Sequence, residues 1–515
     1  MAGIYDVAIV GWGPVGQSLA TLLGRRGWSV VAFDKQPGLY PLPRACHIDH
    51  EAMRILQAMG IADEIADALA PAREYLMLRP DLTVLSDLPR GWQTPSGWDA
   101  SYHFFQPHIE GILDEAAKST PGVTVRQSTT VTQVRDLGDT VQLTVDSGDG
   151  PEEVHARFVI GAAGANRLVK SQAGIDSENL GFEATWVVVD VEIKPGYEEP
   201  KVPDTGQVLD PAQPRHMAWL GTRHYRWEFM LLDGMDPVEA AKPENVWPKL
   251  RHWVNEESAE LLRSTTYTFR SIVADTFNTG RVALAGDAAH LMPPFMGQGM
   301  VSGMRDASTL AWVLDLVLRG AAPLEFLDTY TLSRHSHVLA YINESVRVGE
   351  MVCETDPEKA AARDRMLEAQ TQTPPPFQPP VGGFFVPGPL GGQLSLQPRV
   401  LHNGEYRLLD DVLASPFALL SIDGPDLADL SEAATQTIDR VGIVPAVLTA
   451  EGTPSPESAS PVFAEQGDRF TQWLRAAGAT WVLVRPDGYV YDSGIGRVSL
   501  EASLNTLGES VLVSV

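Results

Sequence analysis

The sequence predicts an α/β protein that is built on a parallel β-sheet and divided into several domains. The chain begins with an apolar strand, a glycine-rich turn, a helix and a second buried strand, and this order is the βαβ unit of parallel sheets. At 515 residues the chain is too long for one compact core, so two or three domains are expected. The proline- and glycine-rich stretch 373–392 cannot be regular helix or sheet, because proline fixes φ and lacks an N–H group. We therefore expect a linker or strap there.

The N-terminal unit consists of a strand at Val7–Val10, a helix at Gln17–Arg26 with leucines on one side, and a strand at Trp28–Phe33. Hydrophobic periodicity predicts the later elements. In chain order these are antiparallel strands within 123–145, a buried strand at 157–164, β-type segments at 186–193 and 216–232, a short buried strand at 281–285, long helices at 308–317 and 335–352, and a small α/β domain beyond the linker. The two β-type segments indicate a sheet that could carry a substrate pocket.

The composition is that of an ordinary globular protein, with 44% hydrophobic and 20% charged residues. The net charge of −27 repels nucleic acids and anionic membranes, so neither is an expected partner. No apolar stretch approaches the roughly 20 residues that span a bilayer, and Asp6 interrupts any signal-peptide pattern, so a cytoplasmic location is expected. Cys46 and Cys353 are the only cysteines and lack CxxC spacing, so neither a disulfide framework nor a metal site is expected.

The segment DVAIVGWGPVGQSLA (6–20) contains a GxGxxG pattern at Gly11, Gly13 and Gly16. In a strand–turn–helix setting the first glycine permits the tight turn, the second lets the backbone approach a pyrophosphate, and the third lets helix and sheet pack closely. The helix N-terminus then faces the anion with free N–H groups. Asp34 stands about 20 residues further on, where a carboxylate binds a ribose 2′-OH. The pattern predicts a dinucleotide site but does not separate NAD from FAD, because both contain that ribose.

A second segment, GRVALAGDAAHLMPPFMGQGMVSGMRDASTLAWVL (280–314), is more specific. A buried strand ends in Gly-Asp, two prolines and a glycine-rich turn follow, and a helix begins. Asp287 at the strand end can hydrogen-bond ribityl or ribose hydroxyls. Gly297, Gly299 and Met300 lie at the start of the helix, where free N–H groups can stabilise an anionic ring oxygen.

Here the sequence resembles the class A flavoprotein monooxygenases, which are single-component FAD-dependent aromatic hydroxylases, and most of all their 3-(3-hydroxyphenyl)propionate hydroxylase and phenol hydroxylase branch. GDAAHLMPPFMGQGM resembles the second FAD-binding motif of that family, and PRACHIDHEAMRIL (43–56) and FFQPHIEGIL (104–113) match it in order and spacing. The resemblance covers residues 5–352. The tail resembles the thioredoxin-like C-terminal domain of phenol hydroxylases, which without CxxC would be structural or interfacial.

The resemblance implies a Rossmann-like FAD-binding domain of the glutathione-reductase type, an inserted β-sheet substrate domain and the thioredoxin-like domain. The expected bounds are 1–180 for the first part of the FAD-binding domain with its antiparallel insert, 181–275 for the substrate-binding sheet, 276–372 for the second part of the FAD-binding domain with the long helices, 373–394 for the linker and 395–515 for the C-terminal domain. A homodimer stays open as an assembly.

The resemblance also implies which residues hold FAD. Arg44 would sit near the pyrophosphate and Gln106 near the ribityl chain, while Val131 would meet the adenine through its backbone and Asp287 would bind the ribityl region. The backbone N–H groups of residues 299–301 would face the isoalloxazine. The full expected cofactor-binding set is Gly11, Gly13, Pro14, Val15, Gly16, Asp34, Lys35, Arg44, Gln106, Val131, Asp287, Pro294, Gly297, Gly299, Met300 and Val301.

Two residues are expected at the reaction site itself. The resemblance implies that Pro294 places its carbonyl above the flavin near the reacting phenol, and that Arg226 in YRWEF lies near the flavin. The substrate pocket is expected between the flavin and the sheet domain. Its candidate lining residues are Trp186, Ala218, Leu220 and Glu228, for which core packing is the alternative.

Ordinary structural roles compete with several of these assignments. Arg44 could be a surface arginine and Gln106 a helix N-terminal cap. His290 is a candidate base, but a histidine behind two alanines is more often a packed, hydrogen-bonded core residue. The same choice arises for Tyr102, His103 and His108, where a structural role is favoured.

The stretch GAAGANRLVK (161–170) departs from the family pattern, in which an aspartate followed by serine and arginine lies near the flavin and the incoming NAD(P)H. Ala163 replaces the aspartate, Arg167 the serine and Lys170 the arginine, and Val301 stands where asparagine is frequent. Ala163 cannot accept a hydrogen bond, whereas Arg167 could meet a phosphate directly. We hypothesise that flavin binding is retained and that reduction by the pyridine nucleotide is altered.

These features together predict FAD-dependent hydroxylation of a phenolic or related aromatic compound with NADH or NADPH and O2. By resemblance, a flavin C4a-hydroperoxide attacks the ring, and the protein supplies orientation, charge stabilisation and a dry cavity. Three alternatives remain. They are an NAD-dependent dehydrogenase that uses the first motif alone and leaves residues 286–301 unexplained, the same fold performing Baeyer–Villiger or ring-opening oxygenation, and a flavoprotein without turnover or with impaired NAD(P)H use.

Overall fold

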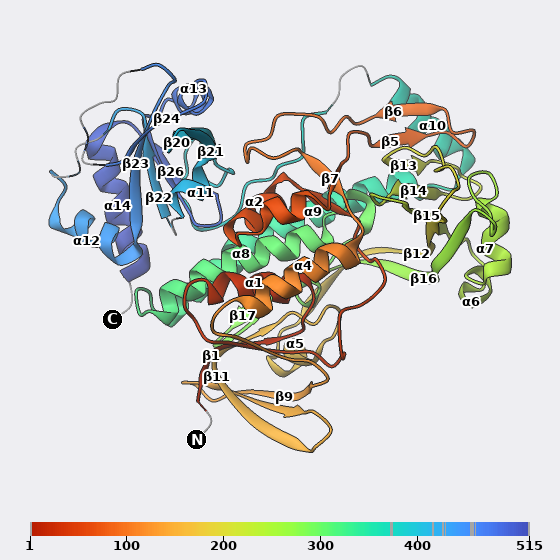
Figure 1. Cartoon of the computed structure of the whole chain (residues 1–515), viewed down its shortest axis with the longest axis horizontal. Coiled ribbons are helices and arrows are strands. Elements are labelled where there is room, and N and C mark those ends of the chain that lie inside the picture. Colours follow the sequence, from red (N-terminus) through yellow and green to blue (C-terminus); the bar gives the residue numbers. More distant parts are fainter. Residues whose placement is uncertain are drawn as a thin grey trace.

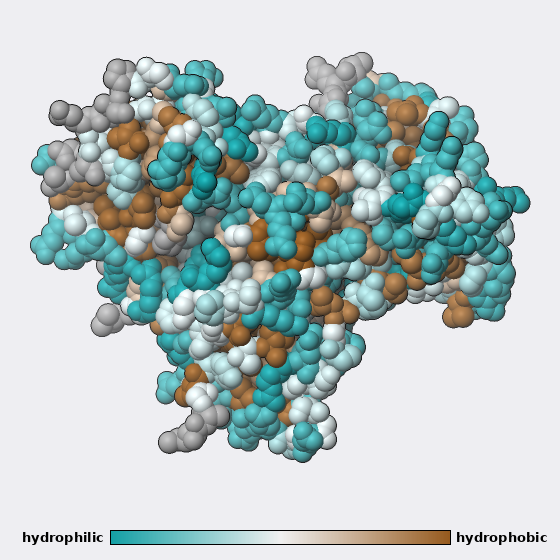
Figure 2. All heavy atoms as spheres, viewed as in Figure 1, coloured by the Kyte–Doolittle hydropathy of each residue, from teal (hydrophilic) through white to brown (hydrophobic). Residues whose placement is uncertain are grey.

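The structure is a computed structural model that describes residues 3–370, 374–414, 417–424, 427, 429–453, 458 and 460–512. Figure 1 shows three parts: a central and lower part that contains the N-terminal chain, a lobe on the right in yellow and green, and a C-terminal lobe in blue. The long helices α8 (Gly299–Leu318) and α9 (Asp328–Val352) run through the middle. Hydrophilic residues cover most of the face seen in Figure 2, in keeping with the acidic composition. None of the described helices is long and apolar enough to cross a membrane.

The first sheet has eight strands and a parallel centre. Its strands are β1 (Tyr5–Val10), β2 (Val30–Phe33), β8 (Val123–Arg126), β9 (Thr130–Asp136), β10 (Val141–Asp146), β11 (Pro151–Gly161), β17 (Asn278–Thr279) and β18 (Val282–Leu284). The parallel neighbours run in the order β18-β11-β1-β2-β8, while β17, β9 and β10 join by antiparallel pairing. β2 is buried along its whole length, as expected for a central strand of a parallel sheet whose two faces are covered.

Two local expectations need correction. The antiparallel pairing predicted within 123–145 is correct for β9 and β10 but wrong for β8, which runs parallel to β2. A parallel neighbour requires a long crossover, and the 34–122 segment supplies one that contains α4 (Gln106–Ser119). The first helix, α1 (Pro14–Gly24), begins at Pro14 rather than at Gln17, because proline is well suited to the first helical position.

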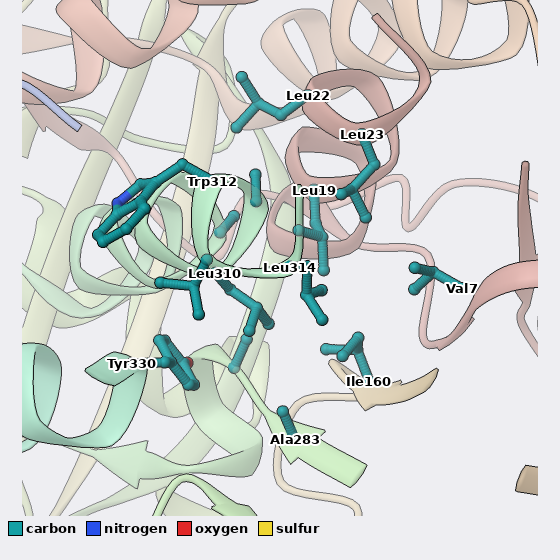
Figure 3. Packing of buried hydrophobic residues seen from close by; sticks show 14 of the residues in the cluster. Val7, Leu19, Leu22, Leu23, Ile160, Ala283, Leu310, Trp312, Leu314 and Tyr330 are labelled. Atoms are coloured by element: carbon teal, nitrogen blue, oxygen red, sulfur yellow. The ribbon is translucent and has the colours of Figure 1, made fainter. Parts of the chain in front are cut away.

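The main core lies where α1 and α8 pack together on the first sheet (Figure 3). The buried residues that meet there include Leu19, Leu22 and Leu23 from α1, Leu310, Trp312 and Leu314 from α8, and Val7, Ile160 and Ala283 from the strands. Burying each leucine contributes roughly 1.5–3 kcal/mol. The helix expected at 308–317 begins earlier, at Gly299, and a Cβ on Gly303 would lie 2.5 Å from Val15 Cγ2. Gly303 therefore allows α8 to pack closely against α1.

The second sheet has eight strands in the order β19-β16-β12-β15-β14-β13-β5-β6. These are β5 (Leu76–Leu78), β6 (Val84–Asp87), β12 (Ser177–Ile193), β13 (Thr205–Val208), β14 (Arg215–Trp219), β15 (His224–Met230), β16 (Ala259–Ala274) and β19 (His290–Leu291). Successive residues of a strand point to opposite faces. Tyr225, Trp227 and Phe229 of β15 pack in a core with α7 (Pro243–Leu250), whereas Arg226 and Glu228 lie on the other face.

The C-terminal part contains a five-stranded sheet in the order β24-β23-β22-β25-β26. Its elements are β20 (Arg399–His402), β21 (Glu405–Leu408), α11 (Leu409–Leu413), β22 (Phe417–Ser421), α12 (Glu432–Val441), β23 (Ile443–Thr449), β24 (Val462–Ala464), α13 (Arg469–Ala476), β25 (Trp481–Val484), β26 (Val490–Gly494) and α14 (Gly496–Leu512). β22, β23 and β24 run parallel, while β25 and β26 are antiparallel to their neighbours. Residues 374–392 contain neither helix nor strand, as their prolines predict; Thr373 lies outside the described residues.

Short elements connect these parts. A three-stranded sheet holds β3 (His47–Asp49), β4 (Ala70–Pro71) and β7 (Ser101–His103). The other elements are α2 (His50–Ala58), α3 (Ala62–Ala66), α5 (Leu168–Gln172), α6 (Pro237–Ala240), α10 (Pro357–Glu368) and the 3-10 turns η1 (Gly286–Ala288), η2 (Pro294–Met296) and η3 (Leu324–Leu327).

Candidate active site

The glycine-rich loop between β1 and α1 has the geometry of a phosphate cradle. Gly11 has φ +115°, and a Cβ there would lie 2.4 Å from Ala162 O. A Cβ on Gly16 would lie 2.2 Å from the carbonyl of Gly11, so both positions require glycine for packing. A Cβ on Gly13, by contrast, would meet no described atom within 4 Å. None of the described side chains caps α1, which begins at Pro14. Free N–H groups therefore face open space where an anion is expected.

Asp34 closes this loop from the end of β2. Its carboxylate accepts the N–H of Trp12 at 2.8 Å and that of Gln36 at 2.8 Å. The N–H of Thr129 donates to the carbonyl of Asp34 at 2.9 Å, and this contact brings the start of β9, with Val131, beside the strand end. The side chain of Val131 is buried, so its backbone is what it can offer to a ligand. The neighbouring Lys35 is exposed.

Gln106 organises the loop that carries Arg44. Its Oε1 accepts the N–H groups of Arg44 at 2.8 Å and Ala45 at 2.7 Å, and its Nε2 donates to Glu110 at 2.9 Å. Gln106 is thus not the cap of its own helix, which sequence reasoning had kept open. The guanidinium of Arg44 is exposed and lies 4.4 Å from the ring centroid of Tyr40, so it is accessible to a phosphate.

Asp287 lies near Arg44. Its side chain is exposed, yet it is surrounded by enough protein for desolvation to raise the pKa of its carboxyl, against the opposing charges of His290 and Arg44. The preceding Gly286 has φ +62°, and a Cβ there would lie 3.0 Å from Val15 Cγ2. Val15 therefore contacts the backbone on which Asp287 sits, and the two sequence motifs meet in space.

The N-terminus of α8 is a second uncapped helix end. Its N-cap residue, Gln298, uses its side chain on Asp49 at 3.2 Å and Arg305 at 2.8 Å instead of on the helix. The first helical residues, Gly299 and Met300, are partly exposed, and the side chain of Val301 is buried. The N–H groups of this first turn are free of intrahelical partners.

The turn before α8 carries the predicted Pro294. Pro294 is exposed, and its carbonyl accepts the N–H of Gly297 at 2.8 Å. Gly297 has φ +65° and packs against His47, since a Cβ there would lie 2.9 Å from His47 Nδ1. This arrangement holds the turn rigidly beside the α8 N-terminus.

These groups fit the two halves of FAD. The α1 N-terminus, Asp34 and Arg44 supply donors, a ribose acceptor and a cation for the ADP half. Asp287 and the α8 N-terminus supply a ribityl acceptor and backbone donors for the flavin half. The open space at Gly13 and the exposed side chain of Asp287 leave both groups accessible to such a ligand.

Arg226 joins the second sheet to the loop that carries Arg44. Its Nε lies 2.7 Å from Asp190 Oδ1, and Arg263 approaches the same carboxylate at 2.6 Å. Burial opposes the charge of Arg226, but Asp190 outweighs it and raises the pKa of the guanidinium. Its Nη1 and Nη2 donate to the carbonyls of Arg44 at 2.7 Å and Pro43 at 3.0 Å. These hydrogen bonds tie the Arg44 loop to β15 of the second sheet.

A polar row crosses the same face of the sheet. Glu228, His216 and Gln207 are register neighbours on β15, β14 and β13. Burial raises the pKa of Glu228 to about 7, although Arg226 opposes this at 3.9 Å. Burial lowers the pKa of His216 to about 3, so that imidazole is neutral at pH 7. Neither His216 Nδ1 nor Gln207 Oε1 has a hydrogen-bond partner among the described residues.

Unpaired polar groups of this kind point to a ligand. An unsatisfied buried polar atom costs roughly 1–3 kcal/mol, and a hydroxyl placed along the row would satisfy it. The row thus has the chemistry to bind a phenolic O–H and to take its proton.

A cavity of about 550 Å³, a volume in the usual range for small-molecule sites, is connected to the row through Tyr75, while Glu228, His216 and Gln207 do not line it. Its lining includes Tyr75, Met77, Arg90, Trp92, Phe295 and Met296. The 374–380 strap and Tyr489 of the C-terminal part close it on another side. The hydroxyl of Tyr75 accepts from Gln207 Nε2 at 3.1 Å and donates to Phe295 O at 2.6 Å. Tyr75 therefore links the cavity to both the row and the η2 turn.

Sequence reasoning missed Tyr75, Gln207 and the cavity. Many segments that are distant in sequence line this cavity, and those that contain Tyr75 and Arg90 carry no local motif. Three of the predicted lining residues, Trp186, Ala218 and Leu220, do not line this cavity. Trp186 is fully buried with its ring 5.9 Å from that of Phe295, and Ala218 and Leu220 are also buried.

The departures from the family pattern lie next to the first motif. A Cβ on Gly11 would lie 2.6 Å from Ala163 Cα, so Ala163 contacts the phosphate loop through its backbone. Arg167 is exposed just before α5, and Lys170 Nζ donates to Ser177 Oγ at 2.8 Å.

The histidines and tyrosine weighed earlier have structural partners. His290 is buried with its Nε2 2.6 Å from Asp306 Oδ2, which is the packed position favoured for it. The hydroxyl of Tyr102 accepts the N–H of Asp99 at 2.8 Å. His103 Nε2 lies 3.0 Å from Thr205 Oγ1. His108 packs edge-on to Phe105.

The chain has relatives among known proteins. Residues 4–345 match the family model described as FAD binding domain, and residues 392–507 match the HcaD C-terminal domain. The chain is 35% identical over 503 residues to the probable NADH-specific resorcinol 4-hydroxylase of Rhodococcus jostii (strain RHA1), with 96% of this chain and 93% of the relative covered. It is 30% identical over 527 residues to the 3-(3-hydroxy-phenyl)propionate/3-hydroxycinnamic acid hydroxylase of Escherichia coli (strain K12), with 98% and 94% covered.

Solved structures share the fold. The flavin-dependent monooxygenase PieE, in complex with FAD and substrate, superposes with a TM-score of 0.79 at 19% identity, and 99% of each chain is covered. Aklavinone-11 hydroxylase, in a ternary complex with FAD and aklavinone, gives a TM-score of 0.78 at 22% identity, with 100% of each chain covered. The mixed α/β fold is therefore that of FAD-dependent monooxygenases.

Proposed function

Since this chain belongs to the FAD binding domain family, and to its FAD-dependent aromatic hydroxylases, we propose that it hydroxylates a phenolic compound with NADH as the reductant and O2 as co-substrate. The observation that carries the proposal is the polar row of Glu228, His216 and Gln207 together with the two uncapped helix N-termini of α1 and α8. A dehydrogenase using the first motif alone is excluded, because the family match runs through residues 286–301.

FAD would be held at both of its ends. The N–H groups at the start of α1 and the Arg44 guanidinium would bind the pyrophosphate, and Asp34 the adenosine ribose. Asp287 would bind the ribityl chain and the first turn of α8 the pyrimidine edge of the flavin. When bound, FAD supplies the transfer of electrons from NADH and the activation of O2.

The chain's own residues would orient and deprotonate the phenol. Glu228 is the proton acceptor in this proposal, because its pKa of about 7 suits general-base catalysis near neutral pH. His216, neutral and adjacent, would hydrogen-bond the phenolic oxygen. The Pro294 carbonyl would border the reacting ring, and Arg226 would act as a positioning residue through the carbonyl of Arg44. The apolar part of the cavity wall, with Met77, Trp92 and Phe295, would exclude water from the ring.

The proposal also assigns a role to each domain. We assign FAD binding to a Rossmann-like domain at 1–180 and 276–372, and substrate binding to the sheet at 181–275. A linker at 373–394 leads to a thioredoxin-like domain at 395–515. The strand order β24-β23-β22-β25-β26, with β25 and β26 antiparallel, supports the thioredoxin-like assignment.

A second candidate is a flavoprotein with impaired use of NADH. The observation that favours it is Ala163, which contacts the phosphate loop but cannot accept a hydrogen bond where relatives of this type carry an aspartate. It differs from the main proposal in the rate of flavin reduction, not in flavin binding.

The test is a panel of phenols incubated with the FAD-loaded protein, NADH and O2. We expect stimulated NADH consumption by at least one phenol, and a product that has gained one oxygen atom with its ring intact. No stimulation across neutral and acidic phenols would contradict the proposal, and an opened ring would replace hydroxylation by ring-opening oxygenation.

A further inference from the structure

One turn of the C-terminal part, residues 485–489 between β25 and β26, docks on helices α2 and α8. Asp487 Oδ2 accepts the hydroxyl of Thr309 at 2.9 Å and the indole N–H of Trp312 at 3.0 Å, and both donors belong to α8. Gly488 has φ +83°, and a Cβ there would lie 3.2 Å from Cζ of Arg54 on α2. The turn is therefore held by both helices, and its last residue, Tyr489, is buried between them and the cavity.

Tyr489 begins a series of hydrogen bonds that ends at the N-terminus of α8. Its hydroxyl donates to Glu51 Oε1, and the other oxygen of Glu51 accepts Arg305 Nε at 2.6 Å. Arg305 Nη1 then donates to Oε1 of Gln298, the N-cap residue of α8, at 2.8 Å. All four side chains are buried and line the cavity. Burial and the charge of Glu51 raise the pKa of Tyr489, so its hydroxyl stays protonated and acts as the donor.

The Tyr489 hydroxyl controls how two carboxylates share Arg305. Glu51 binds Nε, while Asp49 Oδ2 accepts Nη2 at 2.6 Å. A guanidinium favours two parallel hydrogen bonds to a single carboxylate. Because the hydroxyl occupies the second oxygen of Glu51, that oxygen does not compete for Nη2. Without the hydroxyl, Glu51 would draw both N–H groups to itself, and the guanidinium would turn away from Gln298.

The amide of Gln298 is kept away from its own helix by these contacts. Arg305 holds its oxygen, and its Nε2 donates to Asp49 Oδ2 at 3.2 Å. None of the described side chains caps α8. A released amide oxygen would accept N–H groups of the first turn, as N-cap side chains do. It would then compete with the flavin, to which the proposed function assigns those N–H groups.

We propose that Tyr489 is a positioning residue for the flavin, which acts on the N-terminus of α8 through Glu51 and Arg305. This inference rests on the proposed hydroxylase function. It gives the C-terminal part a role in the flavin site, although that part supplies no group that touches the flavin.

The experiment uses Tyr489→Phe, which removes the hydroxyl and keeps the ring. Binding of oxidised FAD is measured by titration of the apoprotein, and the midpoint potential of the flavin is measured in the FAD-loaded protein. Hydrogen bonds to charged groups are the stronger ones, so the loss should be larger for the reduced flavin, which gains negative charge. We expect the affinity for reduced FAD, relative to oxidised FAD, to fall roughly tenfold. This change corresponds to a two-electron midpoint potential that is lower by about 30 mV.

Tyr491→Phe is the matched control. Tyr491 is also buried, lies on β26 and uses its hydroxyl on Ser510, so its variant loses the same atom and should leave the potential unchanged. A second control places Tyr489→Phe in a Gln298→Ala background. No amide is left there to be released, so the potential should no longer respond to the loss of the Tyr489 hydroxyl.

The outcomes separate the inference from the function on which it rests. An unchanged potential in Tyr489→Phe, an equal drop in Tyr491→Phe, or the same drop in the Gln298→Ala background would overturn the inference. Each of these results would leave the hydroxylase function standing, because FAD is bound in all of them. Failure of the wild-type apoprotein to bind FAD would overturn the proposed function itself.

Discussion

Replacing Glu228 by glutamine should change stability and catalysis in opposite directions. The pKa of Glu228 is raised from 4.5 to about 7 by burial. Each pKa unit is worth roughly 1.4 kcal/mol, so ionising this carboxyl costs the folded state roughly 3 kcal/mol relative to the unfolded chain. Because the folded-state pKa is the higher one, the protonated carboxyl contributes this free energy to the stability of the folded state. The contribution is fully present below pH 4.5 and is lost as the pH rises through 7. Glutamine does not titrate and should escape the loss.

The assay is thermal unfolding of the FAD-loaded, substrate-free protein at several pH values from about 5 to 8. The midpoint for Glu228→Gln should rise above that of wild type as the pH increases. The exposed Glu178 of β12 supplies the control, since Glu178→Gln should track wild type. Parallel curves for wild type and Glu228→Gln would refute the reasoning, because they would show that Glu228 does not titrate in this range.

The catalytic part of the prediction is tested with the same variant, Glu228→Gln. If Glu228 takes the phenol proton, kcat/KM of wild type should rise with an apparent pKa near 7, and Glu228→Gln should lower kcat/KM by roughly 10²–10⁴-fold. A loss of activity with an unchanged pH profile would indicate a packing role instead.

Three further predictions concern the cofactor sites and the buried charges. Ala163→Asp should speed anaerobic reduction of the flavin by NADH in stopped-flow measurements, and equal rates at equal NADH concentration would show that this position is irrelevant. Gly13→Ala should fold but bind FAD at least tenfold more weakly in a titration of the apoprotein, because its Cβ occupies only the open ligand space; Gly16→Ala, with its 2.2 Å contact, should lower the unfolding midpoint instead. Asp190→Asn leaves Arg226 and a second arginine without their shared carboxylate, so it should destabilise the protein by roughly 3–5 kcal/mol in denaturant unfolding, and a loss below 1 kcal/mol would contradict this estimate.

The parts of the fold that the sequence predicts are those encoded locally. Apolar periodicity and three glycines predict the β1–α1–β2 unit. The long motif at 280–314 predicts that Asp287 follows the end of a buried strand. The direction of β8 could not be predicted in this way, because it depends on the 34–122 crossover and not on the residues of the strand.

The candidate site was predictable only where a motif marks it. Gln106 is a predicted cofactor residue, but its contacts with the backbone of Arg44 depend on a loop that lies about 60 residues away in sequence and leaves no periodic signal. Tyr75 and Arg90 lie outside helices and strands, and only the folded chain brings them together with η2 and residues 374–380 around one cavity. Glu228 was identifiable as a candidate from its strand, whereas its raised pKa results from burial that only the fold reveals.

The most direct test of the hydroxylase account is the fate of O2. The FAD-loaded protein should convert a phenol in the presence of NADH under 18O2, and the account predicts a product that carries one 18O atom on an intact ring, with water as the other fate of the oxygen. A product without the label, or oxidation of the substrate that proceeds equally well without O2, would contradict it.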